Sequence, residues 1–493
     1  MSKPSMERIA VAVVVSGAAA LVGHVGLRAL GWPWWLAAGL ALLLGAAAGW
    51  WLARRLPGTL DGLRLRRPGL CVVWALLSAL ALVQTARVSA FMIDPARRQQ
   101  SLMPWDDWMT VHSCLTAYTE AARFQGEGKP NIYDPRLYAD RSLGGFHVDL
   151  YHYPPPFLLA PRAVEAVVGS NFSPIRAAWF ALSGLVFMLA IGLVGRSLGP
   201  EAQLRSIFVA PAVWLSVPVQ QGLQMSNVQI LVMSVAVIGL IVMARSSAAG
   251  GAMVAMTIVA KLFPGILLVY LAARRRWRDL AWTLAFSVGF CLLALAVLGR
   301  QPFRAFLDFE LPHLSSGEAF KGPFSRLFAV ARNMAPFGIA LKLERLGVPG
   351  MGLGPGRMIS RVFGLVVFAL AIWAGRGRRR HDPTSPLVAL ALLGLASLGS
   401  PFAPANYVLV PLIWLVAMHP GFGAASGIAV WLLAGVPFFL PRETTPFLVQ
   451  TLAFLPAQAL AMAIPAVILW RAGRSPAAEP GREPLGGQVV QAS

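Results

Sequence analysis

The sequence has 493 residues, of which 57% are hydrophobic and only 13% are charged, and its formal net charge is +21. Many apolar runs exceed the roughly 18 residues that cross a hydrocarbon core of ~30 Å, so the composition is that of a membrane protein and excludes a soluble one. The excess of arginine lies in short loops between apolar runs, which fits the positive-inside rule better than nucleic-acid binding. We therefore expect an all-α polytopic membrane protein.

Acidic residues are concentrated in a few loops. Fourteen of the twenty-one fall in the segments 94–173, 300–356 and 441–446. Arginine clusters occupy the alternate loops, which places them in the cytoplasm by the positive-inside rule. The clusters that we expect to be cytoplasmic are 54–67, 274–278 and 376–380. The carboxylates then lie together on the outer side of the membrane, and we expect the active site there.

The apolar spans follow in chain order. Two are expected at 9–30 and 33–53, a third at 70–92, and the long outer loop 94–173 comes next. Later spans are expected at 175–195, 205–222, 227–244, 279–299, 357–375, 384–399, 405–418, 422–440 and 447–470. With the segment 248–273, these predict a bundle of about 12–14 membrane helices in one domain, residues 1–473, at ~20 residues per span. The Gly/Pro-rich tail 474–493 is predicted to be a disordered cytoplasmic segment.

The segment 248–273 has basic residues at both ends. A single span would place one basic cluster outside and Lys261 near the bilayer centre, at a cost of ~2.5–3.5 kcal/mol. A hairpin of two short helices, broken at Lys261–Pro264, avoids both problems. Its tip would lie inside the membrane, where irregular backbone needs a polar cavity. We expect Lys261 to bind an anion there, although a snorkelling lysine is the alternative.

The long loop begins its structured part with an aspartate pair. Asp106 and Asp107 precede an amphipathic pattern that predicts a helix on the membrane surface, formed by Trp108, Val111, Leu115, Tyr118 and Ala122. Either aspartate alone has an alternative role as the helix N-cap. Two aspartates between tryptophans are more than one cap requires, so we expect at least one to be catalytic.

Other polar positions fall on the same side of the membrane under this topology. These are Tyr133, Tyr153, Asn227, Gln229, His313, Arg326, Arg332 and Asn406. We expect them to form one site with the aspartate pair and Lys261, although interfacial anchoring is the more usual role of such tyrosines. The residues His147, Asp149 and His152 have no firm ligand spacing and no obvious fourth ligand. The sequence therefore predicts neither a metal nor a cofactor.

Several motifs appear in an order that resembles a known family. After the aspartate pair come Gly128–Asp134, which reads Gly-x-x-x-Ile-Tyr-Asp, and Tyr153–Phe157, which reads Tyr-x-Pro-x-Phe. Ser226–Gln229, Ala260–Pro264 and Arg275–Arg278 follow, and the block from Lys-Leu-Phe-Pro to Arg-Arg-Trp-Arg is the most specific. The chain resembles, over roughly residues 70–420, glycosyltransferase family 87 of the membrane-integral C superfamily, which uses polyprenol-phosphate mannose.

The sequence departs from that family in three places. Two spans precede the usual first one, and the loop between Asp107 and Tyr133 is longer than the common spacing. Pro404 and Asn406 stand where the family has an aromatic residue and a histidine. These departures leave open which aspartate corresponds to the catalytic one.

The resemblance implies a reaction. A hexose, with mannose the first expectation, would pass from a polyprenyl-phosphate sugar to a hydroxyl of a glycolipid or glycan, with inversion, at the outer face of the cell membrane. Asp106 or Asp107 would be the general base, and Lys261, Arg326 and Arg332 would bind the donor phosphate. The partners would be the donor lipid, the acceptor and the bilayer, with no nucleic acid.

Two other classes remain as alternatives. A lipid or sugar transporter or flippase would use the broken helix at Lys261 as its transport site. Another lipid-linked transferase, such as a ligase, would share the donor. We find no inverted repeat, and a transporter has little use for a long, acidic and aromatic outer loop, so the transferase is favoured.

Overall fold

The computed structural model describes residues 4–376 and 385–474. Within these residues helices dominate, and the strands β1 (Ser142–Leu143) and β2 (Phe146–His147) form one small antiparallel hairpin. The predicted all-α polytopic fold is confirmed. The predicted disordered tail, apart from Arg474, and most of the basic loop 376–380 lie outside the described residues.

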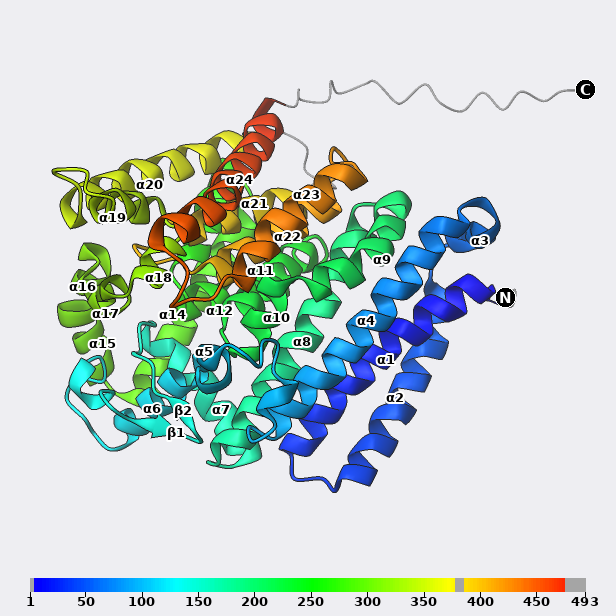
Figure 1. Cartoon of the computed structure of the whole chain (residues 1–493), viewed down its shortest axis with the longest axis horizontal. Helices are drawn as coiled ribbons and strands as arrows, with labels where there is room; N and C mark the ends of the chain where they lie inside the picture. The colour runs from blue at the N-terminus through cyan, green and yellow to red at the C-terminus, as the bar shows by residue number, and fades with distance from the viewer. Residues whose placement is uncertain (1–3, 377–384, 475–493) are drawn as a thin grey trace, which may run out of the picture.

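Long apolar helices form the framework of the bundle (Figure 1). In the part of the chain that the structure describes, seven are long and apolar enough to cross a membrane: α1 (Met6–Ala29), α2 (Trp34–Arg55), α4 (Pro68–Ile93), α8 (Phe172–Ser197), α14 (Trp277–Leu298), α20 (Leu353–Gly375) and α24 (Phe447–Arg474). An eighth span is broken: α9 (Pro200–Leu215) and α10 (Val217–Gln224) meet at 62°. The break lies at Ser216, which is extended, just before Pro218, whose ring cannot continue a helical ladder.

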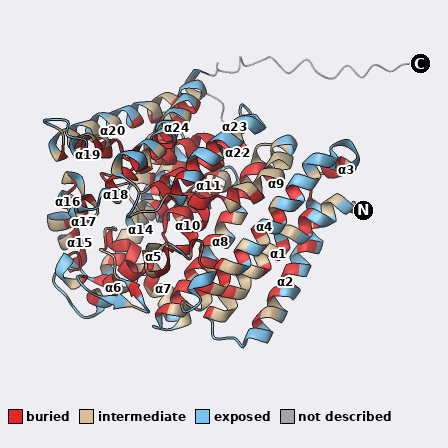
Figure 2. Cartoon of the chain, in the orientation of Figure 1, coloured by how far each residue is buried: buried red, intermediate tan, exposed pale blue. Residues whose placement is uncertain are grey.

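Shorter apolar helices fill the interior. They are α11 (Gln229–Val242), α12 (Ser247–Ala260), α13 (Ile266–Ala273), α21 (Ser385–Ser397), α22 (Ala405–Met418) and α23 (Ala424–Gly435). Nearly every side chain of α11 and α22 is buried, as expected of helices that are apolar on all sides. By contrast, α1, α2 and α4 expose many large apolar side chains, which would face lipid (Figure 2).

The predicted hairpin at 248–273 is present. α12 ends at Lys261, which is extended, and a short 3-10 turn, η5 (Phe263–Gly265), leads into α13. Gly251 near the start of α12 packs against Trp282 near the start of α14 so closely that a Cβ on this glycine would lie 2.9 Å from that of Trp282. α14 begins four residues after α13 ends, so the segment leaves and returns at the same end of the bundle.

The loop between α4 and α8 folds as a layer at one end of the bundle (Figure 1). It contains α5 (Asp107–Val111), α6 (Leu115–Gly126), the β-hairpin, the 3-10 turn η4 (Pro155–Leu158) and α7 (Leu159–Val168). The predicted single surface helix is wrong, because His112 is extended and pairs with His147 in an isolated β-bridge. α6 is also buried, with Leu115 and Tyr118 fully enclosed, because the core under the loop is continuous with that of the bundle.

The segment between α14 and α20 is built from short helices that cover the same end. They are α15 (Gln301–Ala305), η6 (Phe306–Glu310), α16 (Leu311–Ser316), α17 (Lys321–Ser325), α18 (Leu327–Ala331) and α19 (Pro336–Arg345). The buried carboxylate of Glu310 lies 2.7 Å from Nδ1 of His152, which ties this segment to the long loop. Both acid-rich segments therefore lie on one side of the bundle, as the sequence predicts.

Candidate active site

Polar side chains from four separate segments meet where the long loop covers the hairpin tip. Lys261 donates from Nζ to Oε1 of Gln229 at 2.6 Å, and its Nζ lies 5.3 Å from the centre of the Tyr153 ring. Asn227 donates from Nδ2 to Sγ of Cys114 at 3.4 Å. The structure thus brings together four residues that the sequence singled out, Tyr153, Asn227, Gln229 and Lys261.

The turn between α10 and α11 gives Asn227 and Gln229 their positions. Ser226 adopts a left-handed conformation, with φ of 56°, which is uncommon for a residue with a side chain. Such strain is typically tolerated where a functional geometry is held. Oδ1 of Asn227 then accepts from the backbone N–H of Gln229 at 2.9 Å, which fixes the amide and leaves its Nδ2 toward Cys114.

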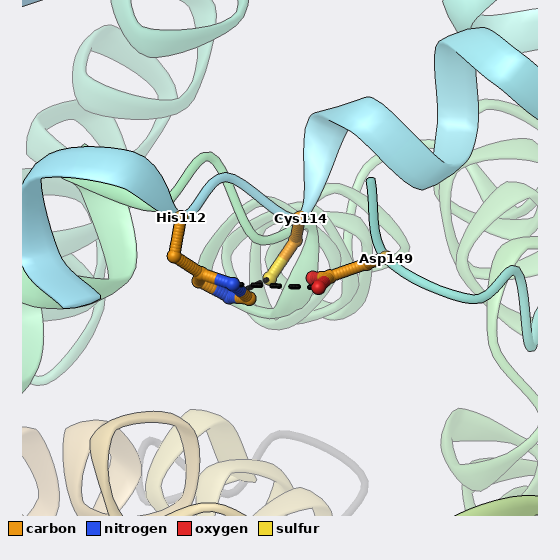
Figure 3. A group of neighbouring side chains, drawn as sticks. All are labelled: His112, Cys114 and Asp149. Carbon is orange, nitrogen blue, oxygen red and sulfur yellow. Dashed lines mark hydrogen bonds and ion pairs between the residues drawn. The ribbon is translucent and has the colours of Figure 1, made fainter. Parts of the chain in front are cut away.

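Asp149 is the carboxylate of this site (Figure 3). Its Oδ1 lies 3.3 Å from Nδ1 of His112, and its backbone N–H donates to Oγ1 of Thr116 at 3.1 Å. The side chain is 29% exposed, so a substrate can reach it. Burial raises the pKa of Asp149 to about 7, although the positive charge of Arg326 acts in the opposite direction.

His112 faces this carboxylate as a neutral imidazole. Burial lowers the pKa of His112 to about 3, and the charges of Arg442 and Arg326 act in the same direction. The ring stacks on Trp108, with 4.2 Å between ring centres, which holds it in place. The partner nearest to the Asp149 carboxylate is therefore a neutral ring, and Arg326 is the cation that acts on it.

His112, Cys114 and Asp149 also form a candidate metal group. Among the described residues, this is the one trio of such side chains whose ligand atoms lie within 4.8 Å of one another. An imidazole, a thiol and a carboxylate are a donor set that zinc accepts. However, Lys261, Arg326 and Arg442 all act electrostatically on members of the trio, and three cations oppose the entry of a divalent metal. The charges favour an anionic ligand.

Cys114 is a hydrogen-bonding residue here and not a thiolate. Its Sγ lies 2.9 Å from the hydroxyl of Tyr407, which comes from α22. Burial raises the pKa of Cys114 to about 12. The thiol therefore joins the long loop to α22 and adds no negative charge.

The predicted aspartate pair lies in a neighbouring cluster. Oδ2 of Asp106 accepts from Nε of Arg442 at 2.7 Å, and the two side chains are 14% and 11% exposed. Asp106 precedes α5 but makes no capping hydrogen bond with its side chain, because the carboxylate is used by Arg442. Asp107 is the first residue of α5 and is exposed.

Trp108 separates the two clusters. The guanidinium carbons of Arg326 and Arg442 lie 5.5 and 5.7 Å from the centre of its ring, whereas His112 stacks on it. Arg326 therefore stands close to both clusters, as its electrostatic effect on Asp149 and His112 also indicates.

The other predicted residues lie in three places. Tyr133 supports Tyr153 through a hydrogen bond from its hydroxyl to the carbonyl of Tyr153 at 3.0 Å. Asn406 is buried beside Met225 in the core under the site. Arg332 is held by the carbonyl of Leu440 at 2.8 Å, and His313 faces the carbonyl of Phe309 at 2.6 Å. Neither of these last two contacts the Asp149 cluster.

Sequence reasoning missed His112, Cys114, Tyr407 and Arg442. The helix pattern gave no sign of these residues, because His112, Ser113 and Cys114 occupy the positions that the expected helix leaves open to polar residues between Val111 and Leu115. No local pattern identifies Arg442, which is 336 residues from its partner.

Comparisons with known proteins give one match. The sequence model of one protein family, Glycosyltransferase family 87, matches residues 151–401, just over half of the chain. No curated protein and no solved structure matches. The matched region contains Tyr153, Asn227, Gln229 and Lys261, and it begins two residues after Asp149. The chain therefore belongs to glycosyltransferase family 87 and is a membrane glycosyltransferase.

Proposed function

We propose that this glycosyltransferase takes a hexose, with mannose as the first candidate, from a polyprenyl-phosphate donor and transfers it to an acceptor hydroxyl with inversion. The acceptor is a glycolipid or glycan on the extracytoplasmic side of the cell membrane. The observation that supports this most strongly is that a reachable carboxylate, Asp149, and the ammonium of Lys261, at a helix break in the bundle, both act electrostatically on the same side chain, Cys114.

In this proposal Asp149 is the general base. It takes the proton from the acceptor hydroxyl while the acceptor oxygen bonds to C1 of the sugar and the bond from C1 to the phosphate oxygen breaks. A carboxylate with a pKa near 7 is a stronger base than an ordinary one, and half of it is in the ionised, active form at pH 7. The neutral His112 orients it without removing its basicity.

The aspartate pair predicted from sequence stays a prediction for this role, and the geometry favours Asp149 over it. The carboxylate of Asp106 is engaged by the guanidinium of Arg442 at 2.7 Å, so it is not free to face an acceptor hydroxyl. Asp107 is exposed, and none of its interactions links it to the hairpin tip in the part of the chain that the structure describes.

Lys261 binds the donor phosphate in the proposal. The electron pair of the broken bond goes to the phosphate, so its charge rises during the reaction and a fixed cation stabilises that change. Oε1 of Gln229 accepts one hydrogen bond from the ammonium and leaves its other N–H groups for phosphate oxygens. Arg326 supplies further positive charge near Asp149, whereas Arg332 is occupied by a carbonyl.

The test uses purified protein in nanodiscs with radiolabelled polyprenyl-phosphate mannose or glucose and a panel of glycolipid acceptors. We expect release of polyprenyl phosphate and a labelled glycolipid of inverted anomeric configuration, which NMR identifies. Donors that stay intact with every acceptor would contradict the proposal.

A second candidate is a transporter that moves a lipid-linked sugar across the membrane. The observation in its favour is the re-entrant hairpin with a lysine at its tip. In proteoliposomes, a transporter would equilibrate labelled donor between leaflets without consuming it, whereas the proposed transferase consumes donor at a fixed leaflet.

A further inference from the structure

A second basic site lies where α3 (Leu63–Arg66) and the start of α4 meet α9. A cavity of about 540 Å³ opens there. Its walls include Leu63, Leu70, Leu204 and Phe208, and Arg66, Arg67 and Arg205 also line it. The catalytic proposal uses none of these residues, so the inference is independent of that proposal.

The positive charge of this cavity is only partly neutralised inside the protein, because the carboxylate of Asp61, which acts on Arg66, is already paired with Arg8. Arg66 donates to the carbonyl of Asp61 at 2.7 Å, and Arg205 donates to the carbonyl of Ala417 at 2.7 Å and to that of Phe422. Carbonyls fix these guanidinium groups without cancelling their charge. Among the described residues the side chain of Arg67 has no hydrogen bond or ion pair, and Glu201 is the one acidic residue that lines the cavity.

The position of the cavity identifies the ligand class. α4 is a membrane-crossing helix that starts at Pro68, directly after Arg67, so the guanidinium groups stand at the level where a span enters the membrane. The apolar walls continue along α4 and α9 below them. Three guanidinium groups against one carboxylate, above an apolar wall, complement a phosphodiester that is attached to acyl chains. The positive-inside rule assigns this end of α4 to the cytoplasmic leaflet.

We propose that this cavity binds the headgroup of an anionic glycerophospholipid from the cytoplasmic leaflet, with the acyl chains along Leu70, Leu204 and Phe208. The lipid would fill the junction between the N-terminal helices α1, α2 and α4 and the body that contains α9. A small hydrophobic core of Val11, Leu56, Leu60 and Trp74 lies beside the same junction and packs against Leu204 and Phe208.

Photoaffinity labelling tests the site. Purified full-length protein in mixed micelles is exposed to diazirine analogues of phosphatidylglycerol or phosphatidylcholine, and peptides spanning 200–215 are quantified by mass spectrometry. We expect the anionic analogue to label this peptide several-fold more strongly, because each arginine that lines the cavity should contribute about fivefold in affinity for an anionic headgroup, the scale of one basic residue at a membrane surface.

Variants give the test its control. Arg67→Gln should lower labelling by the anionic analogue about fivefold and leave labelling by the neutral analogue unchanged. Arg64→Gln removes the same charge from α3 but does not line the cavity, so it should leave labelling unchanged. The side chain of Arg67 donates no hydrogen bond to a carbonyl among the described residues, so its replacement removes no such contact. Monodispersity and an unchanged melting temperature would establish that the variant folds.

Three results would overturn the proposal. One is equal labelling by both analogues. Another is equal loss in Arg64→Gln and Arg67→Gln, which would indicate a diffuse surface effect. The last is complete displacement of the anionic analogue by millimolar inorganic phosphate but not by unlabelled phosphatidylglycerol, which would assign the site to a free anion.

Discussion

Asp149 and Asp106 lie on either side of Trp108, yet they have opposite environments. A guanidinium lies 2.7 Å from Asp106, whereas a neutral imidazole lies 3.3 Å from Asp149. The ion pair engages the carboxylate of Asp106, while burial raises the pKa of Asp149 to about 7. The partner of a carboxylate, more than its place in a motif, therefore decides whether it acts in chemistry or in structure.

Removing the Asp149 carboxylate should have the largest effect. Asp149→Asn keeps the shape of the side chain but cannot accept the acceptor proton, so turnover should fall by about 10²-fold or more. Donor consumption per folded molecule measures it. Normal turnover in this variant, together with loss of turnover in Asp107→Asn, would contradict Asp149 as the base. Asp107 is the exposed neighbour of Asp106.

Substitutions of Lys261 test the proposed binding of the donor phosphate at the same site. Lys261→Met removes the charge that faces the leaving phosphate and should reduce turnover by about 10- to 100-fold, on the scale of a lost electrostatic contact. Lys261→Arg should fall between Met and wild type, because a planar fork replaces a compact ammonium.

The melting temperature distinguishes a chemical role of Lys261 from a structural one. We expect Lys261→Met to melt at the wild-type temperature or above it, because a charge is removed from membrane depth. A lower melting temperature with unchanged activity per folded molecule would make the residue structural.

The ion pair on the other side of Trp108 should matter for stability more than for turnover. Arg442→Gln leaves Asp106 without its partner and should cost about 1–3 kcal/mol of stability, with a change in turnover of only a few-fold. Thermal unfolding of Arg442→Gln, Asp106→Asn and the double variant measures the coupling between the two side chains. Additive effects of the two substitutions would show that the pair is not coupled, contrary to the 2.7 Å contact.

Much of this arrangement could be predicted from sequence. The seven long apolar helices of the described residues follow from apolar runs, whereas the break at Ser216 inside the span expected at 205–222 was not predicted. The hairpin at Lys261 follows from basic residues at both of its ends, since a single span would leave charged residues inside the membrane or on its outer side. The meeting of Tyr153, Asn227, Gln229 and Lys261 follows from the same topology, because it places all four near one side of the bilayer.

The catalytic candidate itself could not be predicted. Asp149 gains its raised pKa from burial under a loop whose fold no periodicity describes, and its nearest partner, His112, is 37 positions earlier in the sequence. The Asp106–Asp107 pair was the more visible motif, but Arg442 joins Asp106 from a loop between α23 and α24. Contacts between distant segments decide the chemistry of both carboxylates.

The pH dependence of kcat/KM in the wild type and in Asp106→Asn tests the central claim most directly. With Asp149 as the base, its active form is the ionised one, so the rate should rise about tenfold from pH 6 to pH 8, with a midpoint near 7. Asp106→Asn should keep that midpoint, because Asp106 is not the titrating base. A wild-type rate that is flat over this range, or a midpoint that disappears in Asp106→Asn, would contradict the account.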